Sequence, residues 1–172
     1  SDARFPVPTT PPSSSIAVDA DVDARWGYLF PTNDFRKLTL TSRFADFGGP
    51  QALLMWEAQT GSSAEGVMLL DPFVLDALLG VVGPVTVEGE EYSQGMALEY
   101  LLKGQYAQFG PDAEGTDARR DQLSIIAGAV LERVQTGNFD PVQLVKAMRP
   151  MISGRHLMLY SSNPAEQAGW EA

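Results

Sequence analysis

Runs of hydrophobic and polar residues predict short strands separated by helices along this chain. Residues 66–70 (GVMLL) form a continuous apolar run, which is typical of a strand covered on both faces. Residues 84–88 predict a second short strand, and residues 156–160 (HLMLY) predict a buried one. In residues 16–24 (IAVDADVDA) apolar residues alternate with aspartates, which predicts an edge strand with one acidic face.

Longer apolar periodicities predict helices between these strands. Residues 51–59 (QALLMWEAQ) predict one helix, and Ser93 is placed to cap another. The longest predicted helix begins at Thr116 and ends at Gly137. Its apolar residues recur at intervals of three and four, as a buried helical stripe requires: Leu123, Ile126, Ala127, Val130, Leu131 and Val134.

The same helix-starting dipeptide occurs three times. Asp71, Asp140 and Asn163 each stand directly before a proline. The side-chain oxygen of such a residue accepts hydrogen bonds from free backbone N–H groups, and proline at the first helical position has no N–H to leave unpaired. We therefore interpret Asp71 as a helix cap rather than a catalytic group, although strand ends in α/β sheets often line sites. The helix after Asp140 is predicted to close near Pro150.

These elements predict an α/β fold. The expected architecture is a small mixed sheet of about four strands with helices on both faces. Residues 1–15 are rich in Pro, Ser and Thr and predict an extended linker, and residues 16–172 predict a single α/β domain.

Composition excludes several kinds of chemistry. The formal net charge of −10 provides no general basic field, so neither nucleic acid nor an anionic membrane surface is expected as a partner. The absence of cysteine excludes thiol nucleophiles, disulfides and cysteine-based zinc sites. No apolar run is long enough to span a bilayer. Because His156 is the one histidine of the sequence, a histidine-rich metal site is excluded. We interpret His156 as a residue at the start of a strand whose ring nitrogens have hydrogen-bond partners.

Two groups of basic residues are candidates for binding phosphate. The first is Arg36 and Lys37 with Arg43, and the second is Lys103 with Arg119 and Arg120, which flank residues 104–118. Scattered, solvated surface charge is the alternative interpretation of both groups. Arg119 and Arg120 fall in the first turn of the predicted helix, where positive charge opposes the helix dipole.

Several segments in a characteristic order resemble the Domain of Unknown Function 4012 family. They are WGYLFPTNDFR, DPFVLDALLGVVGPVTV, ALEYLLKGQYAQF, DARRDQLSIIAGAVLERVQTG and HLMLYSSNPAEQA. The resemblance covers residues 26–171 and corresponds to the C-terminal two-thirds of the family domain. It implies that this is a fragment of a larger extracellular domain, in an envelope protein of a Gram-positive bacterium with an upstream membrane anchor.

The apolar strand, the acidic residue and the following helices are also similar to the LytR–CpsA–Psr ligases. Those enzymes have an α/β/α fold and transfer glycopolymers from polyprenyl pyrophosphate, using arginines for the pyrophosphate and aspartates for magnesium. The ligases carry Arg-x-Arg where this chain has Leu102-Lys103-Gly104, and Arg-x-x-Arg-Gln where it has residues 117–122. Only Arg120 and Gln122 are matching counterparts, so a shared fold is favoured over a shared reaction.

The favoured function is therefore a non-catalytic extracellular module that binds a wall polymer, a lipid-linked precursor or a partner protein, without a cofactor. The alternative is a degenerate or relocated phosphotransferase acting on polyprenyl-pyrophosphate glycopolymers. In that case Lys103, Arg119, Arg120 and Gln122 would hold phosphate, and Asp34 or Asp71 would hold Mg²⁺. A purely structural scaffold is the third possibility.

Overall fold

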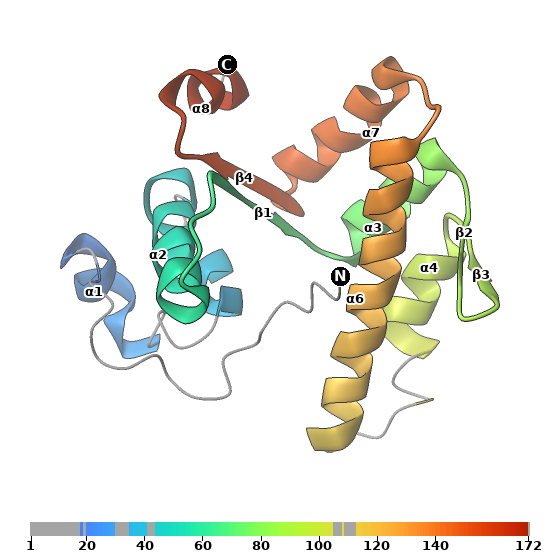
Figure 1. Ribbon diagram of the computed structural model, residues 1–172, viewed down its shortest axis with the longest axis horizontal. Helices are drawn as coiled ribbons and strands as arrows, with labels where there is room; N and C mark the ends of the chain where they lie inside the picture. The colour runs from blue at the N-terminus through green and yellow to red at the C-terminus, as the bar shows by residue number, and fades with distance from the viewer. Residues whose placement is uncertain are drawn as a thin grey trace. The chain divides into compact units, whose positions relative to one another are not determined.

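The structure is a computed structural model that describes residues 18, 20–29, 35–40, 44–104, 108 and 113–171. The described residues divide into two compact units. One unit comprises Leu70–Leu157, and the other comprises the described residues on either side of that segment. Figure 1 shows helices as the main element of both units. None of the helices in the described residues is both long and apolar enough to cross a membrane.

Helix α3 (Pro72–Val82) forms the centre of the unit Leu70–Leu157. It contacts α4 (Met96–Glu99), α6 (Ala113–Thr136) and α7 (Pro141–Ser153) (Figure 1). Its buried residues are Val74, Leu75, Leu78 and Leu79, which recur at the spacing of one helical face. Complete burial of such a side chain contributes about 1.5–3 kcal/mol, so α3 supplies much of the unit's hydrophobic stabilisation.

Two short strands, β2 (Val85–Val87) and β3 (Glu90–Tyr92), form an antiparallel hairpin in the same unit. The turn residues Glu88 and Gly89 both have positive φ, at 53° and 87°. Positive φ at both central residues matches the right-handed twist of the flanking strands, which is why such turns favour two-residue hairpins. The register pairs Val85 with Tyr92. Both of these side chains are buried.

Helix α6 and the π-helical segment η5 (Tyr100–Gly104) complete this core. Their buried hydrophobic side chains in the described residues are those of Leu101, Ile126 and Val130. The predicted apolar stripe is therefore confirmed at its centre. The predicted start at Thr116 is wrong, because α6 begins at Ala113. Arg119 and Arg120 consequently lie beyond the first turn of the helix, and their predicted conflict with the helix dipole does not arise.

The second unit is built around helix α2 (Gly49–Thr60), which continues directly from the π-helical segment η4 (Phe44–Gly48). Leu38, from the 3₁₀ segment η3 (Phe35–Leu40), packs with Ala52 and Met55 of α2. Helix α1 (Ala20–Trp26) precedes the segment η1 (Gly27–Leu29). The rings of Trp26 and Phe47 lie 5.9 Å apart, which places α1 against η4.

Strands β1 (Gly66–Leu70) and β4 (Leu157–Ser161) pair with each other, and helix α8 (Pro164–Glu171) follows β4. A Cβ atom on Gly66 would lie 2.8 Å from the backbone oxygen of Tyr160, so the pairing needs glycine there. The turn into α8 is held by side chains. The Ser161 hydroxyl donates to Glu166 at 2.8 Å, and the Ser162 hydroxyl donates to the backbone oxygen of Glu65 at 2.9 Å.

The α/β composition is confirmed, but the predicted single sheet of about four strands is wrong for the described residues. They form two separate two-stranded antiparallel sheets, β1 with β4 and β2 with β3. Strand β1 is also not covered on both faces, since Met68 is 55% exposed. A two-stranded sheet lacks the neighbouring strands and covering layers that would bury a central strand.

The predicted edge strand 16–24 is wrong where the structure describes it, because residues from Ala20 onward belong to α1. Val22 is buried and Trp26 is half-buried, which is the four-residue spacing of a helical face rather than the alternation of a strand. Asp21 and Arg25, also four residues apart, lie 3.7 Å from each other on the exposed side. An exposed pair of this kind adds little stability, so packing of Val22 and Trp26 decides the conformation.

All three predicted Asp-Pro and Asn-Pro caps are confirmed. The side chain of Asp71 accepts from the amides of Phe73 and Val74. Asp140 accepts from Val142 at 2.9 Å, and Asn163 accepts from Ala165 at 3.0 Å.

The predicted cap of one other helix is wrong, and α7 ends three residues after Pro150, near which its end was predicted. Gly95, with φ of 85°, occupies the cap position of α4 that was predicted for Ser93, and Asp76 accepts from its amide at 2.6 Å. Helix α7 continues past Pro150 to Ser153. Proline this close to a helix end removes one backbone hydrogen bond without preventing the last turn from forming.

A glycine of helix α2 and a glycine of helix α6 predict opposite effects of the same substitution. A methyl group on Gly49 would collide with the ring of Tyr160, whereas the space around Gly128 is open. We expect Gly49→Ala to lower the free energy of unfolding by about 1–3 kcal/mol because of overpacking. Gly128→Ala should raise it by about 0.5–1 kcal/mol, because alanine loses less backbone entropy in a helix. Urea denaturation followed by circular dichroism measures both, and equal effects of the two substitutions would contradict the close contact at Gly49.

Candidate functional site

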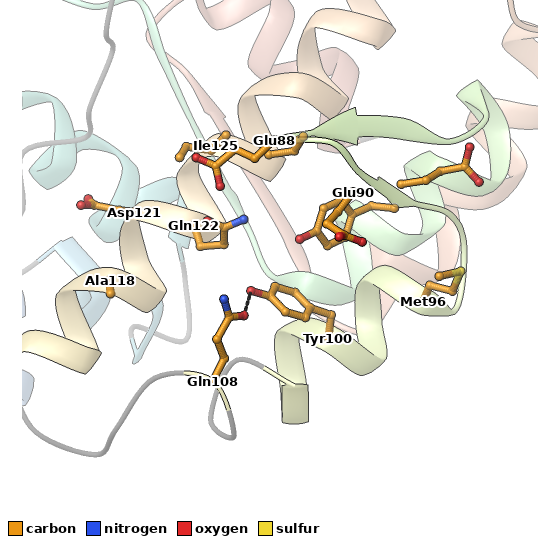
Figure 2. A pocket seen from close by; sticks show the side chains of 12 residues that line it. Glu88, Glu90, Met96, Tyr100, Gln108, Ala118, Asp121, Gln122 and Ile125 are labelled. Atoms are coloured by element: carbon orange, nitrogen blue, oxygen red, sulfur yellow. Dashed lines mark hydrogen bonds between the residues drawn. The ribbon is translucent and has the colours of Figure 1, made fainter.

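A groove of about 750 Å³ lies within the unit Leu70–Leu157 and is the candidate site. The β2–β3 hairpin, the α4–η5 segment and helix α6 each contribute to its wall (Figure 2). Its lining residues are Val87, Glu88, Glu90, Glu91, Tyr92, Met96, Tyr100, Gln108, Ala118, Asp121, Gln122 and Ile125. A groove of this volume accommodates a small-molecule ligand or a short segment of a polymer.

Tyr100 and two glutamines supply the neutral polar groups of the groove. The hydroxyl of Tyr100 donates to Oε1 of Gln108 at 2.7 Å. Figure 2 shows the amide of Gln122 directed into the space that Tyr100 and Gln108 border. The ring of Tyr92 meets that of Tyr100 edge to face, with centroids 5.4 Å apart. This packing holds the Tyr100 ring in place and leaves its hydroxyl at the groove, because edge-to-face pairs of aromatic rings are favourable.

The described lining of the groove is acidic. It contains four carboxylate residues, Glu88, Glu90, Glu91 and Asp121, and no lysine, arginine or histidine. Figure 2 shows that the carboxylate of Asp121 points away from the groove, so the hairpin glutamates provide most of the local negative charge. A negative potential repels anions and favours neutral hydroxyl-bearing or cationic ligands.

The environment of Tyr100 favours its neutral form. Partial burial is the main cause that raises the pKa of the Tyr100 phenol above its ordinary value, and the neighbouring Tyr92 and the Glu88 carboxylate raise it further. The phenol therefore remains a hydrogen-bond donor at neutral and moderately alkaline pH. A donor held in this way can bind a hydroxyl, carbonyl or ether oxygen of a ligand.

The predicted phosphate-binding residues are only partly placed by the described structure. Gln122 lines the groove, whereas Lys103 lines an adjoining pocket of about 450 Å³ with Met96, Glu99, Tyr100 and Gly104. Met96 and Tyr100 border both spaces. Arg119 and Arg120 belong to α6, but their side chains lie outside the part of the chain that the structure describes. The assignment of these four residues to a phosphate site stays a prediction.

Asp71 was predicted to be a helix cap and, under the alternative function, a ligand of Mg²⁺. Both oxygens of its carboxylate contact other residues. Oδ1 accepts from the amides of Phe73 and Val74, at 2.9 and 3.3 Å. Oδ2 lies 2.6 Å from Nδ1 of His156, and the Phe73 and His156 rings have centroids 4.8 Å apart. The interpretation that the His156 ring has a hydrogen-bond partner is therefore confirmed at Nδ1. Asp71 both caps α3 and holds the residue before β4.

No metal site emerges from the predicted magnesium ligands. Asp34 lies outside the described residues. In the part of the chain that the structure describes, no group of three or more histidine, aspartate or glutamate side chains could hold a metal ion. Hard cations such as Mg²⁺ require several oxygen ligands in near-octahedral geometry, which Asp71 alone cannot provide.

Sequence reasoning missed the hairpin that forms one wall of the groove. Residues 89–93 (GEEYS) contain two adjacent glutamates, which disfavour a strand, so β3 was not predicted. The available signal was the pair Glu88-Gly89, an acidic residue followed by glycine after a β-branched run, which resembles a two-residue hairpin turn.

A comparison with protein families shows which family the chain is related to. A family model described as "Protein of unknown function (DUF4012)" matches residues 1–106, which is more than half of the 172 residues. The chain belongs to the DUF4012 family. Comparisons with curated proteins and with solved structures found no match.

The extent of the DUF4012 match differs from the extent of the predicted resemblance. The match includes residues 1–25 and stops at residue 106, whereas the segments that suggested the family were taken to cover residues 26–171. Within the groove of this DUF4012 chain, the hairpin and Tyr100 fall inside the matched range, and the α6 residues fall outside it. No finding supports the resemblance to the LytR–CpsA–Psr ligases.

The double role of Asp71 predicts that its removal costs more than removal of a simple cap. Asp71→Ala removes the cap of α3 and leaves His156 without its partner, whereas Asp140→Ala removes only the cap of α7. We expect Asp71→Ala to lower the free energy of unfolding of this DUF4012 chain by about 1 kcal/mol more than Asp140→Ala does. Chemical denaturation of both variants measures the difference. Equal losses would contradict a stabilising Asp71–His156 contact.

The raised pKa of Tyr100 predicts a change in stability at alkaline pH. The folded state holds the phenolic proton more tightly than the unfolded state, whose tyrosine titrates near pH 10. The contribution of Tyr100 to stability is therefore complete below about pH 10 and is lost as the pH rises through the raised value. Phenolate absorbance of the wild type minus that of Tyr100→Phe measures the titration. In the native DUF4012 chain this difference should appear at higher pH than in concentrated guanidinium, and coincident curves would contradict it.

Proposed function

We propose that this chain is a non-catalytic binding module on the extracellular face of a bacterial cell envelope. In this proposal the groove holds a segment of a wall polymer that is neutral or carries amino sugars, and the full-length protein is anchored in the membrane. The envelope setting is what the resemblance to the DUF4012 family implies, and the matching family model supports membership of that family. The groove supports binding rather than catalysis, because its described lining offers hydrogen bonds without a nucleophile–base pair.

The single observation that carries the proposal is the combination of Tyr100, Gln108, Gln122 and the hairpin glutamates around one groove. Sugars present dense arrays of hydroxyl groups, and each hydroxyl both donates and accepts hydrogen bonds. Glutamates accept from such hydroxyls, glutamine amides do both, and the protonated phenol of Tyr100 donates. Glutamates also attract the ammonium group of an unacetylated amino sugar.

The phosphotransferase alternative fits the described groove less well. A degenerate LytR–CpsA–Psr-like enzyme with an α/β/α fold would present cations to a polyprenyl pyrophosphate, because transferring phosphate charge needs counter-charge. Glu88, Glu90 and Glu91 present the opposite charge in the groove, and Lys103 lines the adjoining pocket instead. This alternative therefore depends on Arg119 and Arg120, whose side chains lie outside the described residues. A lipid-linked pyrophosphate precursor meets the same repulsion.

Oligosaccharide titration tests the proposal. Isothermal calorimetry should detect binding of a glucosamine oligosaccharide and weaker binding of its N-acetylated counterpart, with no binding of pyrophosphate and Mg²⁺. Gln122→Ala should weaken binding about ten-fold, which is the effect of removing one hydrogen bond to a polar ligand. Gln59→Ala is the matched control, because Gln59 is an exposed helical glutamine of the other unit.

The outcomes separate the two candidate functions. Binding of both oligosaccharides that is insensitive to Gln122→Ala would place the ligand outside the groove and overturn the proposal. Binding of pyrophosphate and Mg²⁺ that is lost in Arg119→Gln or Arg120→Gln would favour the phosphotransferase. For the amino-sugar ligand, affinity should also fall as salt concentration rises, because added ions screen the contact with the hairpin glutamates.

A further inference from the structure

Helix α7 exposes an apolar surface on the side that does not pack within its unit. Val142, Val145 and Ile152 are 58%, 67% and 50% exposed. Their spacing of three and seven residues places them on one face of the helix. The half-buried residues of α7 lie on the neighbouring face, and they are Leu144, Ala147, Met148 and Met151. Because α7 contacts α3, the half-buried face accounts for the packing of the helix and the exposed face does not take part in it.

The same face carries positive charge. Arg149 follows Val142 by seven residues and precedes Ile152 by three. Lys146 follows Val142 by four and lies at the edge of this face, where it also lines a pocket against α3. Neither cation forms an ion pair with any residue that the structure describes. From Pro141 to Ala165 the sequence contains no aspartate or glutamate, although the whole chain has 22 of them and a net charge of −10. The positive charge of α7 is therefore local and contrasts with the rest of the chain.

We propose that this α7 face, formed by Val142, Val145, Lys146, Arg149 and Ile152, binds to an anionic lipid surface. Interfacial helices insert an apolar stripe at the boundary between headgroups and acyl chains, and their lysines and arginines contact the anionic headgroups. The excess of negative charge elsewhere in the chain is repelled by such a surface, so it would orient α7 toward the lipid. The negative net charge of the whole chain predicts no membrane partner, but the local charge of the α7 face is positive.

A lipid surface fits the α7 face better than a second copy of the chain does. Three exposed apolar side chains cover far less than the area of roughly 1,200 Å² that a stable protein interface buries. Weak contacts with a membrane need no such area, because each lysine or arginine near an anionic surface adds attraction independently. The α7 face also shares no residue with the groove, so this inference stands whether or not the groove binds a polymer.

Vesicle flotation with the full chain tests the inference. Phosphatidylcholine vesicles containing about 30% phosphatidylglycerol should bind the chain, and pure phosphatidylcholine vesicles should bind it much less. Lys146→Gln with Arg149→Gln should reduce the partition coefficient about 30-fold. Val145→Ser with Ile152→Ser should reduce it about ten-fold by removing the inserted side chains. Raising NaCl to about 0.5 M should release the chain, because the ions screen the headgroup charge.

Two matched controls keep the test specific. Leu54→Ser changes an apolar side chain of another helix that is 47% exposed, and Arg25→Gln removes an exposed cation of helix α1. Both should leave partitioning unchanged. Circular dichroism checks folding, and the charge variant alone carries the test if the apolar variant fails to fold. Absence of binding to anionic vesicles, equal losses in the control variants, or a dimer in sedimentation that Val145→Ser dissociates would each overturn the proposal.

Discussion

The contact between Asp71 and His156 joins two residues that are 85 positions apart, and the unit Leu70–Leu157 lies almost entirely between them. Closing so long a segment costs chain entropy, which the contact offsets together with the hydrophobic packing around α3. Asp71 is well placed for this because its second oxygen fixes the first turn of α3. One carboxylate therefore contributes both to the core helix and to the closure of the chain.

The parts of this fold that were predictable from sequence are those decided by neighbouring residues. The caps at Asp71, Asp140 and Asn163 depend on contacts two or three residues away, and each was predicted correctly. The strand pairing was not predictable, because β1 pairs with β4 and β3 forms only against β2. Helix α1 was mistaken for a strand because Ile16, Val18, Ala20 and Val22 alternate with aspartates, whereas its packing depends on Val22 and Trp26.

The groove contains one residue that the sequence had singled out, and the assignment of that residue to phosphate stays a prediction. Gln122 was named as a phosphate ligand through the ligase resemblance, and it does line the groove, but in the company of glutamates. Tyr100 was not among the predicted site residues, although its hydroxyl borders the groove and contacts Gln108. Which side of a half-buried tyrosine reaches solvent depends on the segments that pack around it. Such information comes from residues far along the chain, here Tyr92 and Gln108.

The hairpin glutamates have a consequence beyond the groove. A two-stranded sheet has an open edge on each side, and the unpaired backbone groups of such an edge can recruit a strand from another molecule. On β3 the exposed residues Glu90 and Glu91 lie along one of these edges. A second copy approaching edge to edge would bring its own two glutamates against them, and the repulsion opposes aggregation through the hairpin.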